Sequence, residues 1–303
     1  MRTRSTVLRL VAAAAVLTVG VTACGGNDEP AASGSKGGDI KVGAYDFPEG
    51  RLLANIYVDW LKKAGYNASL LQLAQRQTAQ PALQKGDVDV LPEYVSSALN
   101  FYKPNSATVD DAKNYATLKE LGAAKGVTYY TPAPAKDNYA FVVTKDFSTK
   151  NSVTTLSQLA AYSQKTPITF GGTQECRDAS YCKAGLEKIY GMKFGQYKTI
   201  VLSSQTAVDG LVKNDYVAAV FNSSDGVLAP TVGNPVVVLT DDKALNPNDF
   251  IVPAVNSKKS TPELESSLND LSKRITQDEL LRMNQETQNE RRPVEKVAED
   301  FVG

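Results

Sequence analysis

Short apolar segments alternate with segments of helical periodicity along the first part of the chain. Apolar runs of strand length occupy residues 40–45, 68–73 and 87–91, and apolar residues at helical spacing occupy 52–66 and 78–86. Each helical segment ends close to a glycine, which is a common helix stop. This β-α-β-α-β order predicts a mostly parallel sheet with helices packed against it.

The second half of the chain repeats the alternation. It predicts strands at 138–145, 167–170, 199–202, 217–221, 235–242 and 250–255, and helices at 184–191 and 206–214. Thr155 and Gln158 have the spacing of a capping box for a helix that continues through Ala161. Thr261 with Pro262, and then Thr276, are predicted to begin two helices near the C-terminus, and a last helix is expected at 293–301.

Two α/β lobes are therefore expected, one formed by residues 39–140 and 251–303 and the other by residues 141–250. The chain would cross between the lobes twice, near 140 and near 250, and the two crossings would form a hinge. A cleft between two lobes is a favoured site for a small molecule. The segment that follows the apolar run 87–91 draws attention here, because Pro92, Glu93 and Tyr94 stand where a strand gives way to a helix.

The N-terminus has the pattern of an export signal and not of a folded element. Residues 1–23 begin with arginines and continue as a short apolar run that ends in small residues. Val21-Thr22-Ala23-Cys24 is similar to a lipobox, which predicts cleavage before Cys24 and a lipid on its thiol. The alternative is a plain signal peptide with an incidental cysteine. Residues 24–38 are small and polar and predict a flexible tether to the extracytoplasmic face of the cell membrane.

Charge and composition exclude several classes of function. The chain has 33 basic and 33 acidic residues, so it lacks the excess of positive charge that is typical of proteins that bind nucleic acid. It has no histidine, which removes the commonest general base and a frequent metal ligand. Neither a metal site nor a cofactor is expected. Once Cys24 carries the lipid, Cys176 and Cys182 remain, and in an oxidising compartment a disulfide between them is the default interpretation.

Several segments resemble, in order, the substrate-binding proteins of osmoprotectant ABC transporters. These segments are KVGAYDFPEGRLLANIYVDWLKKAGY, QRQTAQPALQKGDVDVLPEYVSSA, DNYAFVVTKDF, GLEKIYGMKF and SSDGVL, followed by the helical tail. The resemblance covers nearly the whole chain after the tether. It implies a two-lobed periplasmic-binding-protein-like fold of type II with the ligand cleft between the lobes. It also implies a monomer that binds glycine betaine, choline or a similar quaternary ammonium compound for a membrane permease.

The resemblance further implies a cage of aromatic rings around the trimethylammonium group. Tyr94 in the PEY motif and Tyr139 in DNYAF match two cage tyrosines of the family, and Phe221 falls where many members have a third. Ser97 matches a hydroxyl residue that holds the other end of the ligand, and Asp137 matches an acidic residue beside the cation. Ring faces suit such a ligand because a quaternary ammonium has no N–H to donate.

This sequence departs from the family pattern where the ligand carboxylate is normally held. Tyr45 stands at the family's lysine position, and Ala179 stands at its arginine position, with Arg177 two residues earlier. Asp249 falls where the family has a further cage tyrosine. A buried carboxylate without a cationic partner is costly. Either Arg177 takes the arginine's role or the ligand has no carboxylate. Choline, or a neutral or aromatic small molecule, then stands beside glycine betaine as an alternative.

Structural roles remain open for each of these residues. A tyrosine at a strand end is commonly a packing residue, Phe221 lies in an apolar run typical of a sheet core, and Arg177 suits a solvated loop. Two other classes of function also remain, an exported enzyme and a surface lipoprotein that kept the fold without transport. The missing histidines disfavour the enzyme.

Overall fold

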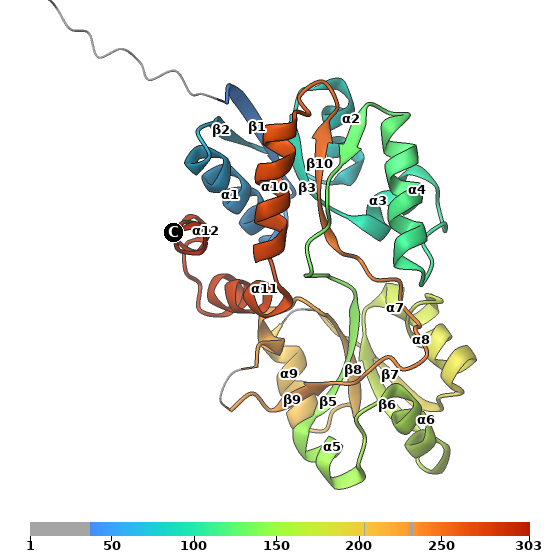
Figure 1. Cartoon of the computed structure of the whole chain (residues 1–303). Helices are drawn as coiled ribbons and strands as arrows, with labels where there is room; N and C mark the ends of the chain where they lie inside the picture. The colour runs from blue at the N-terminus through green and yellow to red at the C-terminus, as the bar shows by residue number, and fades with distance from the viewer. Residues whose placement is uncertain (1–36, 203, 231–232) are drawn as a thin grey trace, which may run out of the picture. The chain divides into compact units, whose positions relative to one another are not determined.

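Two five-stranded sheets, each flanked by helices, make up the computed structural model, which describes residues 37–202, 204–230 and 233–303 (Figure 1). The first sheet has the order β2-β1-β3-β10-β4 and consists of β1 (Asp39–Ala44), β2 (Asn67–Gln72), β3 (Val90–Tyr94), β4 (Val127–Tyr129) and β10 (Ile251–Asn256). The second has the order β7-β6-β8-β5-β9 and consists of β5 (Tyr139–Thr144), β6 (Ile168–Gly172), β7 (Phe194–Thr199), β8 (Ala218–Asn222) and β9 (Val236–Val238). The fold is therefore α/β with two lobes.

Both sheets are mixed, whereas the sequence predicts mostly parallel ones. In the first sheet β1 pairs in parallel with β2 and β3, and β10 pairs antiparallel with β3 and β4. In the second, β6 pairs in parallel with β7 and β8, and β5 pairs antiparallel with β8 and β9. β5 and β10 are the strands that follow the two crossings. Because they run antiparallel, their first residues lie beside the carboxyl ends of β8 and β3.

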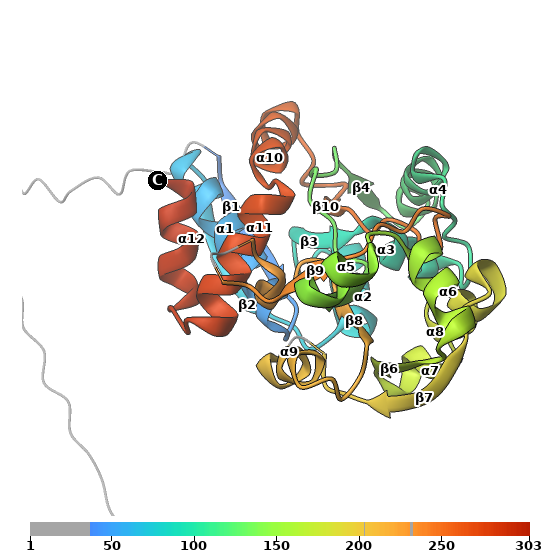
Figure 2. The same ribbon diagram turned by 90° about the horizontal axis from the view of Figure 1, so that it is seen from below.

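The helices of the first lobe come from both ends of the chain. They are α1 (Pro48–Lys63), α2 (Arg76–Lys85), α3 (Val95–Tyr102), α4 (Asp111–Ala123), α10 (Pro262–Arg274), α11 (Gln277–Asn284), the π-helix η3 (Gln285–Asn289) and α12 (Val294–Val302). The hydroxyl oxygens of Thr261 and Thr276 accept the N–H groups of Leu264 and Glu279, so the predicted caps are confirmed. α12 packs beside α1, as both views show (Figures 1 and 2). The C-terminal helices thus complete the first lobe.

The helices of the second lobe are shorter. They are α5 (Lys145–Asn151), α6 (Leu156–Lys165), α7 (Gln174–Asp178), α8 (Lys183–Gly185), the π-helix η1 (Leu186–Tyr190), α9 (Gln205–Val212) and the 3-10 helix η2 (Gly226–Leu228). Thr155 and Gln158 form the predicted capping box. The strand predicted at 199–202 is wrong, because β7 ends at Thr199. Apolar clusters cover both faces of each sheet and hold the strand ends in place.

β3 is longer than the sequence predicts and includes the PEY motif. It ends at Tyr94 and not at Leu91, although a proline in a central strand is normally disfavoured. Pro92 is tolerated because it lies opposite Pro253 of β10, so two residues without an N–H face each other. Tyr94 is consequently the last residue of a central strand, directly before α3.

Two sequence predictions concern the N-terminus and the lobe boundaries. Residues 1–36, with the predicted signal peptide and Cys24, lie outside the described residues. The lobe boundaries at 140 and 250 also stay a prediction, because the described residues belong to one compact unit. Among the described helices, none combines the length and the apolar character that crossing a bilayer requires.

Candidate functional site

A cavity of about 420 Å³ opens where the strand ends of both sheets and the two crossings meet. The first lobe contributes Phe47, Arg76, Tyr94, Ser96, Ser97 and Asn100, and the second contributes Tyr139, Tyr181 and Asn222. The crossings contribute Asp137, Asn138, Asn246, Pro247 and Asp249. The size suits a small organic molecule.

Strand polarity explains why these residues meet. Phe47, Arg76 and Ser96 lie in the turns or helix starts that follow β1, β2 and β3. Asn222 is the last residue of β8, and Tyr139 is the first residue of the antiparallel β5 and lies opposite it. The carboxyl ends of parallel strands are the usual place for ligands in α/β sheets. Both sheets present that edge to the same cavity.

Two pairs of aromatic rings line the cavity, one from each lobe. The ring centroids of Phe47 and Tyr94 are 6.3 Å apart with an interplanar angle of 38°. Those of Tyr139 and Tyr181 are 5.6 Å apart with an angle of 47°. The tilted arrangement leaves ring faces free for a further partner.

Two of these rings are unusually exposed. Phe47 is 38% exposed and Tyr181 is 39% exposed, and they are the two exposed aromatic side chains among the described residues. Leaving a large aromatic side chain in water forgoes a stabilisation of about 1.5–3 kcal/mol. That both lie in the wall of one cavity indicates a binding surface.

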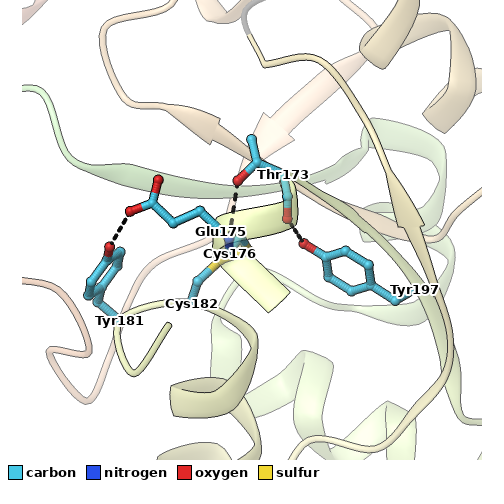
Figure 3. The surroundings of a disulfide bond; sticks show 6 residues. All are labelled: Thr173, Glu175, Cys176, Tyr181, Cys182 and Tyr197. Carbon is cyan, nitrogen blue, oxygen red and sulfur yellow. Dashed lines mark hydrogen bonds between the residues drawn. A yellow bond between two sulfur atoms is a disulfide. The ribbon is translucent and has the colours of Figure 1, made fainter. Parts of the chain in front are cut away.

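A disulfide fixes the loop that carries Tyr181. Cys176 and Cys182 are bonded, so the predicted pair is present in the structure (Figure 3). Tyr181 precedes Cys182, and its hydroxyl donates to Glu175 Oε1 at 2.9 Å. The N–H of Cys176 donates to Thr173 Oγ1, and the Tyr197 hydroxyl donates to the Thr173 carbonyl. The disulfide and these hydrogen bonds thereby hold Tyr181 on a short closed loop, in place of packing in an apolar core.

The Tyr94 ring is held from behind by a buried carboxylate. Its hydroxyl donates to Glu49 Oε1 at 2.5 Å, and Glu49 itself is 5% exposed. Burial raises the pKa of the Tyr94 hydroxyl well above its ordinary value, and the charges of Glu49 and Asp137 raise it further. The phenol therefore stays protonated and acts as the donor. The ring face is left for the cavity.

Two carboxylates, those of Asp137 and Asp249, line the cavity itself. Burial raises the pKa of Asp137 well above its ordinary range, and the nearby charges of Glu49 and Asp225 add to the effect. Asp137 Oδ1 is buried and has no hydrogen-bond partner among the described residues. Burial also raises the pKa of Asp249 to about 6, against the hydrogen bonds from Ser97 and the charge of Arg76. Both carboxylates would gain from a cation in the cavity.

The one cationic side chain in the cavity wall is already paired. Arg76 donates through Nε and Nη2 to both oxygens of Glu93, with Nη2 2.8 Å from Oε1. Burial would lower the pKa of the guanidinium, but the charge and hydrogen bonds of Glu93 raise it. Glu93 also accepts the Tyr45 hydroxyl at 2.5 Å. The charge of Arg76 is thus largely neutralised, and its Nη1 takes no part in the bonds to Glu93.

Three of the predicted site residues lie away from the cavity wall. Phe221 is fully buried in the cluster beneath β5 and β8, because its neighbour Asn222 takes the outward position on the strand. Tyr45 lies behind Phe47, with ring centroids 5.7 Å apart. Arg177 is exposed, and its guanidinium lies 5.1 Å from the centroid of the Tyr197 ring. The remaining five, Tyr94, Ser97, Asp137, Tyr139 and Asp249, lie together in the wall.

Sequence reasoning missed Phe47 and Tyr181, although each left a signal. Phe47 stands between a polar residue and Pro48, directly after a buried strand. Tyr181 is a large ring in a short polar loop between two cysteines. An aromatic residue without apolar neighbours in sequence, in a short connecting loop, is a candidate for ligand contact and not for the core.

Comparisons with known proteins agree with this architecture. Residues 38–303 match the family model described as the substrate binding domain of ABC-type glycine betaine transport system. A glycine betaine-binding protein of Escherichia coli (strain K12), YehZ, is 27% identical over 280 residues, covering 87% of this chain and 89% of that protein. A glycine-betaine-binding protein of Pseudomonas aeruginosa is 22% identical over 272 residues, covering 87% of this chain and 86% of that protein.

A solved structure shows the same fold. The structure of a glycine betaine/carnitine/choline ABC transporter protein superimposes with a TM-score of 0.78 at 23% sequence identity. The match covers 87% of this chain and 96% of that one. At this level of identity the superposition supports the two-lobed fold.

Proposed function

Because the chain belongs to the family of substrate-binding domains of ABC-type glycine betaine transport systems, we propose that it binds a quaternary ammonium osmolyte between its two aromatic pairs. Members of this family serve transport, so the chain is a solute-binding protein of an ABC importer and the family is not one of enzymes. The bound osmolyte would be glycine betaine, choline or a close relative. The protein would then deliver it to a membrane permease.

The observation that carries the proposal is the pairing of aromatic rings across the cavity. A quaternary ammonium group has methyl groups all round and no N–H, so hydrogen bonds cannot hold it. The negative face of each ring attracts it by about 0.5–2 kcal/mol, depending on how far the contact is desolvated. Phe47 and Tyr94 offer such faces from one lobe, and Tyr139 and Tyr181 offer them from the other. A ligand between the pairs would touch both lobes at once and favour a closed hinge.

The charges in the wall support a cationic group. Asp137 and Asp249 reach the cavity, while the charge of Arg76 is taken up by Glu93. A cation in the cavity would therefore meet a net negative surrounding. The raised pKa values of both aspartates have the same cause, since each carboxylate is buried without a nearby unpaired cation.

The other end of the ligand would meet polar donors. Asn100, Asn138, Asn222 and Asn246 line the cavity, and the Nδ2 of Asn246 is buried without a hydrogen-bond partner among the described residues. Together with Arg76 Nη1, these amides could hold a carboxylate or a hydroxyl. Ser97 contributes less freely, because its Oγ already donates to Asp249 Oδ2 at 2.6 Å. The donors suit both glycine betaine and choline.

The N-terminal sequence supports a location for this function at the membrane. Export and a lipid on Cys24 would keep the protein at the extracytoplasmic face of the membrane, next to its permease. A single copy holds both halves of the proposed cage, so a monomer suffices.

Titration calorimetry with glycine betaine, choline, carnitine and proline betaine tests the proposal. We expect saturable binding of at least one of these ligands, without turnover, and weaker binding by at least about tenfold in Tyr139→Ala. No heat with any of the four at millimolar concentration would overturn the assignment. Tight binding of a neutral aromatic molecule instead would favour the alternative ligand class.

A further inference from the structure

Glu49 is a buried carboxylate that the cavity wall does not include. It lies in the first turn of α1, directly after Pro48, where the positive end of the helix dipole favours a negative charge. It is 5% exposed, and no lysine or arginine of the described chain lies within 4.0 Å of its oxygens. A buried carboxylate without a cationic partner is costly, so its retention calls for an explanation.

The hydrogen bonds of Glu49 use both of its carboxylate oxygens. Oε1 accepts the hydroxyl of Tyr94 at 2.5 Å, and Oε2 accepts Asn284 Nδ2 at 2.6 Å. The orientation of the Asn284 amide is not ambiguous, because the same Nδ2 also donates to the carbonyl of Ser224 at 2.8 Å. Each oxygen of Glu49 therefore accepts one hydrogen bond.

The second tyrosine–carboxylate pair of this lobe provides a contrast. Tyr45 donates to Glu93 with the same 2.5 Å distance, but Glu93 is neutralised by Arg76, and Tyr45 does not line the cavity. Tyr94 does line the cavity, and the carboxylate behind it has no such partner. The two pairs have the same kind of hydrogen bond, from a tyrosine hydroxyl to a carboxylate, and differ in net charge.

We infer that Glu49 acts through Tyr94 as a remote counter-charge for the ligand, so that it determines the preference of the site for a cation over a neutral molecule of the same shape. Two effects combine. A phenol that donates to a carboxylate gains electron density, which strengthens the attraction of its ring face for a cation. The negative charge of the buried Glu49 itself adds to the field at the cavity. Glu49 is a positioning and specificity residue, since it does not touch the ligand.

The inference rests on the proposed function, and the test measures selectivity. Choline is compared with its neutral carbon analogue, 3,3-dimethylbutan-1-ol, and glycine betaine with 3,3-dimethylbutanoate. If choline binds the unaltered protein more tightly than glycine betaine does, the choline pair is used, and otherwise the glycine betaine pair is used. The quantity compared is the ratio of the two dissociation constants within that pair. A general loss of structure would weaken the binding of both ligands and leave the ratio of their dissociation constants unchanged.

Glu49→Gln is expected to reduce the preference for the quaternary member by about fivefold or more, within the range that cation–π attraction spans. Asp89→Asn is the matched control, because Asp89 is also 5% exposed and precedes the opposite end of β3, about 16 Å from Tyr94. The control should leave the ratio unchanged. An unchanged ratio in Glu49→Gln, or an equal fall in Asp89→Asn, would overturn the inference.

Tyr94→Phe keeps the inference falsifiable if Glu49→Gln does not fold. It retains the ring and removes the link to Glu49 but leaves the charge of Glu49 in place. The ratio should therefore fall, by less than in Glu49→Gln, and the double variant should fall no further than Glu49→Gln alone. An unchanged ratio in Tyr94→Phe would also overturn the inference. If the unaltered protein binds no quaternary ligand, the proposed function fails, and this inference fails with it. If the unaltered protein binds a quaternary ligand and the variants keep the same ratio, the inference about Glu49 is wrong while the proposed function stands.

Discussion

The carboxylate of Asp249 holds the first turn of α3 through Ser97, a residue 152 positions away in the sequence. Oδ1 accepts the N–H groups of Ser96 and Ser97 at 2.7 and 3.1 Å, and Oδ2 accepts the Ser97 hydroxyl at 2.6 Å. The return crossing is thus tied to the helix that follows Tyr94. One side chain connects the hinge, the cavity wall and the aromatic ring.

Replacing Asp249 should therefore reduce stability through loss of this cap. We expect Asp249→Ala to lower the free energy of unfolding by about 1–2 kcal/mol, and Asp249→Asn to lower it less because its amide oxygen still accepts N–H groups. Urea unfolding monitored by circular dichroism measures both. Equal midpoints for Asp249→Ala and the unaltered protein would contradict this role.

Ligand affinity should fall in acid, although a quaternary ammonium does not titrate. Burial raises the pKa of Asp249 to about 6, so lowering the pH from 7.5 to 5 removes the negative charge of this carboxylate from the cavity. We expect affinity to weaken by roughly threefold or more. Asp249→Asn should flatten the part of the profile near pH 6, and a flat profile in the unaltered protein would argue against charged walls.

The stability of the ligand-free protein should change with pH in the opposite sense. A carboxyl group with a raised pKa in the folded state binds its proton more tightly when folded, so its stabilising contribution is present below its ordinary value of 3.8. That contribution is lost as the pH rises through about 6. Comparing the pH dependence of unfolding in Asp249→Asn and in the unaltered protein isolates it. The prediction fails if the Asp249 contribution increases with pH over this range.

The two exposed rings should contribute to binding more than to folding. Phe47→Ala and Tyr181→Ala are each expected to weaken binding of the quaternary ligand by about tenfold, the value of one cation–π contact. Phe221→Leu is the matched aromatic control, because Phe221 is buried in the core and absent from the cavity wall. It should lower stability by about 1 kcal/mol and leave affinity within a factor of two. The reverse pattern would place Phe221 in the cage and remove Phe47 and Tyr181 from it.

Opening the disulfide should affect binding through Tyr181. Replacing both Cys176 and Cys182 by serine removes a short loop closure worth roughly 2 kcal/mol and frees the segment that carries the ring. We expect a lower melting temperature together with several-fold weaker binding. In the Tyr181→Ala background the same replacement should no longer weaken binding. If it does, the loop acts through another residue.

The sequence predicts much of the fold and about a third of the cavity wall, and the reason differs from residue to residue. Tyr94 and Tyr139 stand in motifs with recognisable neighbours, so a resemblance reaches them. Phe47 and Tyr181 lie in loops whose course depends on packing and on a disulfide, which local patterns do not encode. Phe221 illustrates a different limit. A uniformly apolar strand does not show which of its alternating side chains faces the cavity, and here Asn222 does.

The role of Glu49 could not be predicted because its partners are distant in sequence. Tyr94 is 45 residues away, and Asn284 is 235 residues away. In the sequence Glu49 is an ordinary acidic residue in the first turn of a helix. Only the fold places it behind a ring that lines the cavity.

A crystal structure with a bound quaternary ligand tests the central claim most directly. The account predicts that the quaternary nitrogen lies within about 6 Å of ring centroids from both pairs, Phe47 with Tyr94 and Tyr139 with Tyr181. A ligand bound with that nitrogen away from these four rings, or against one lobe alone, would contradict it.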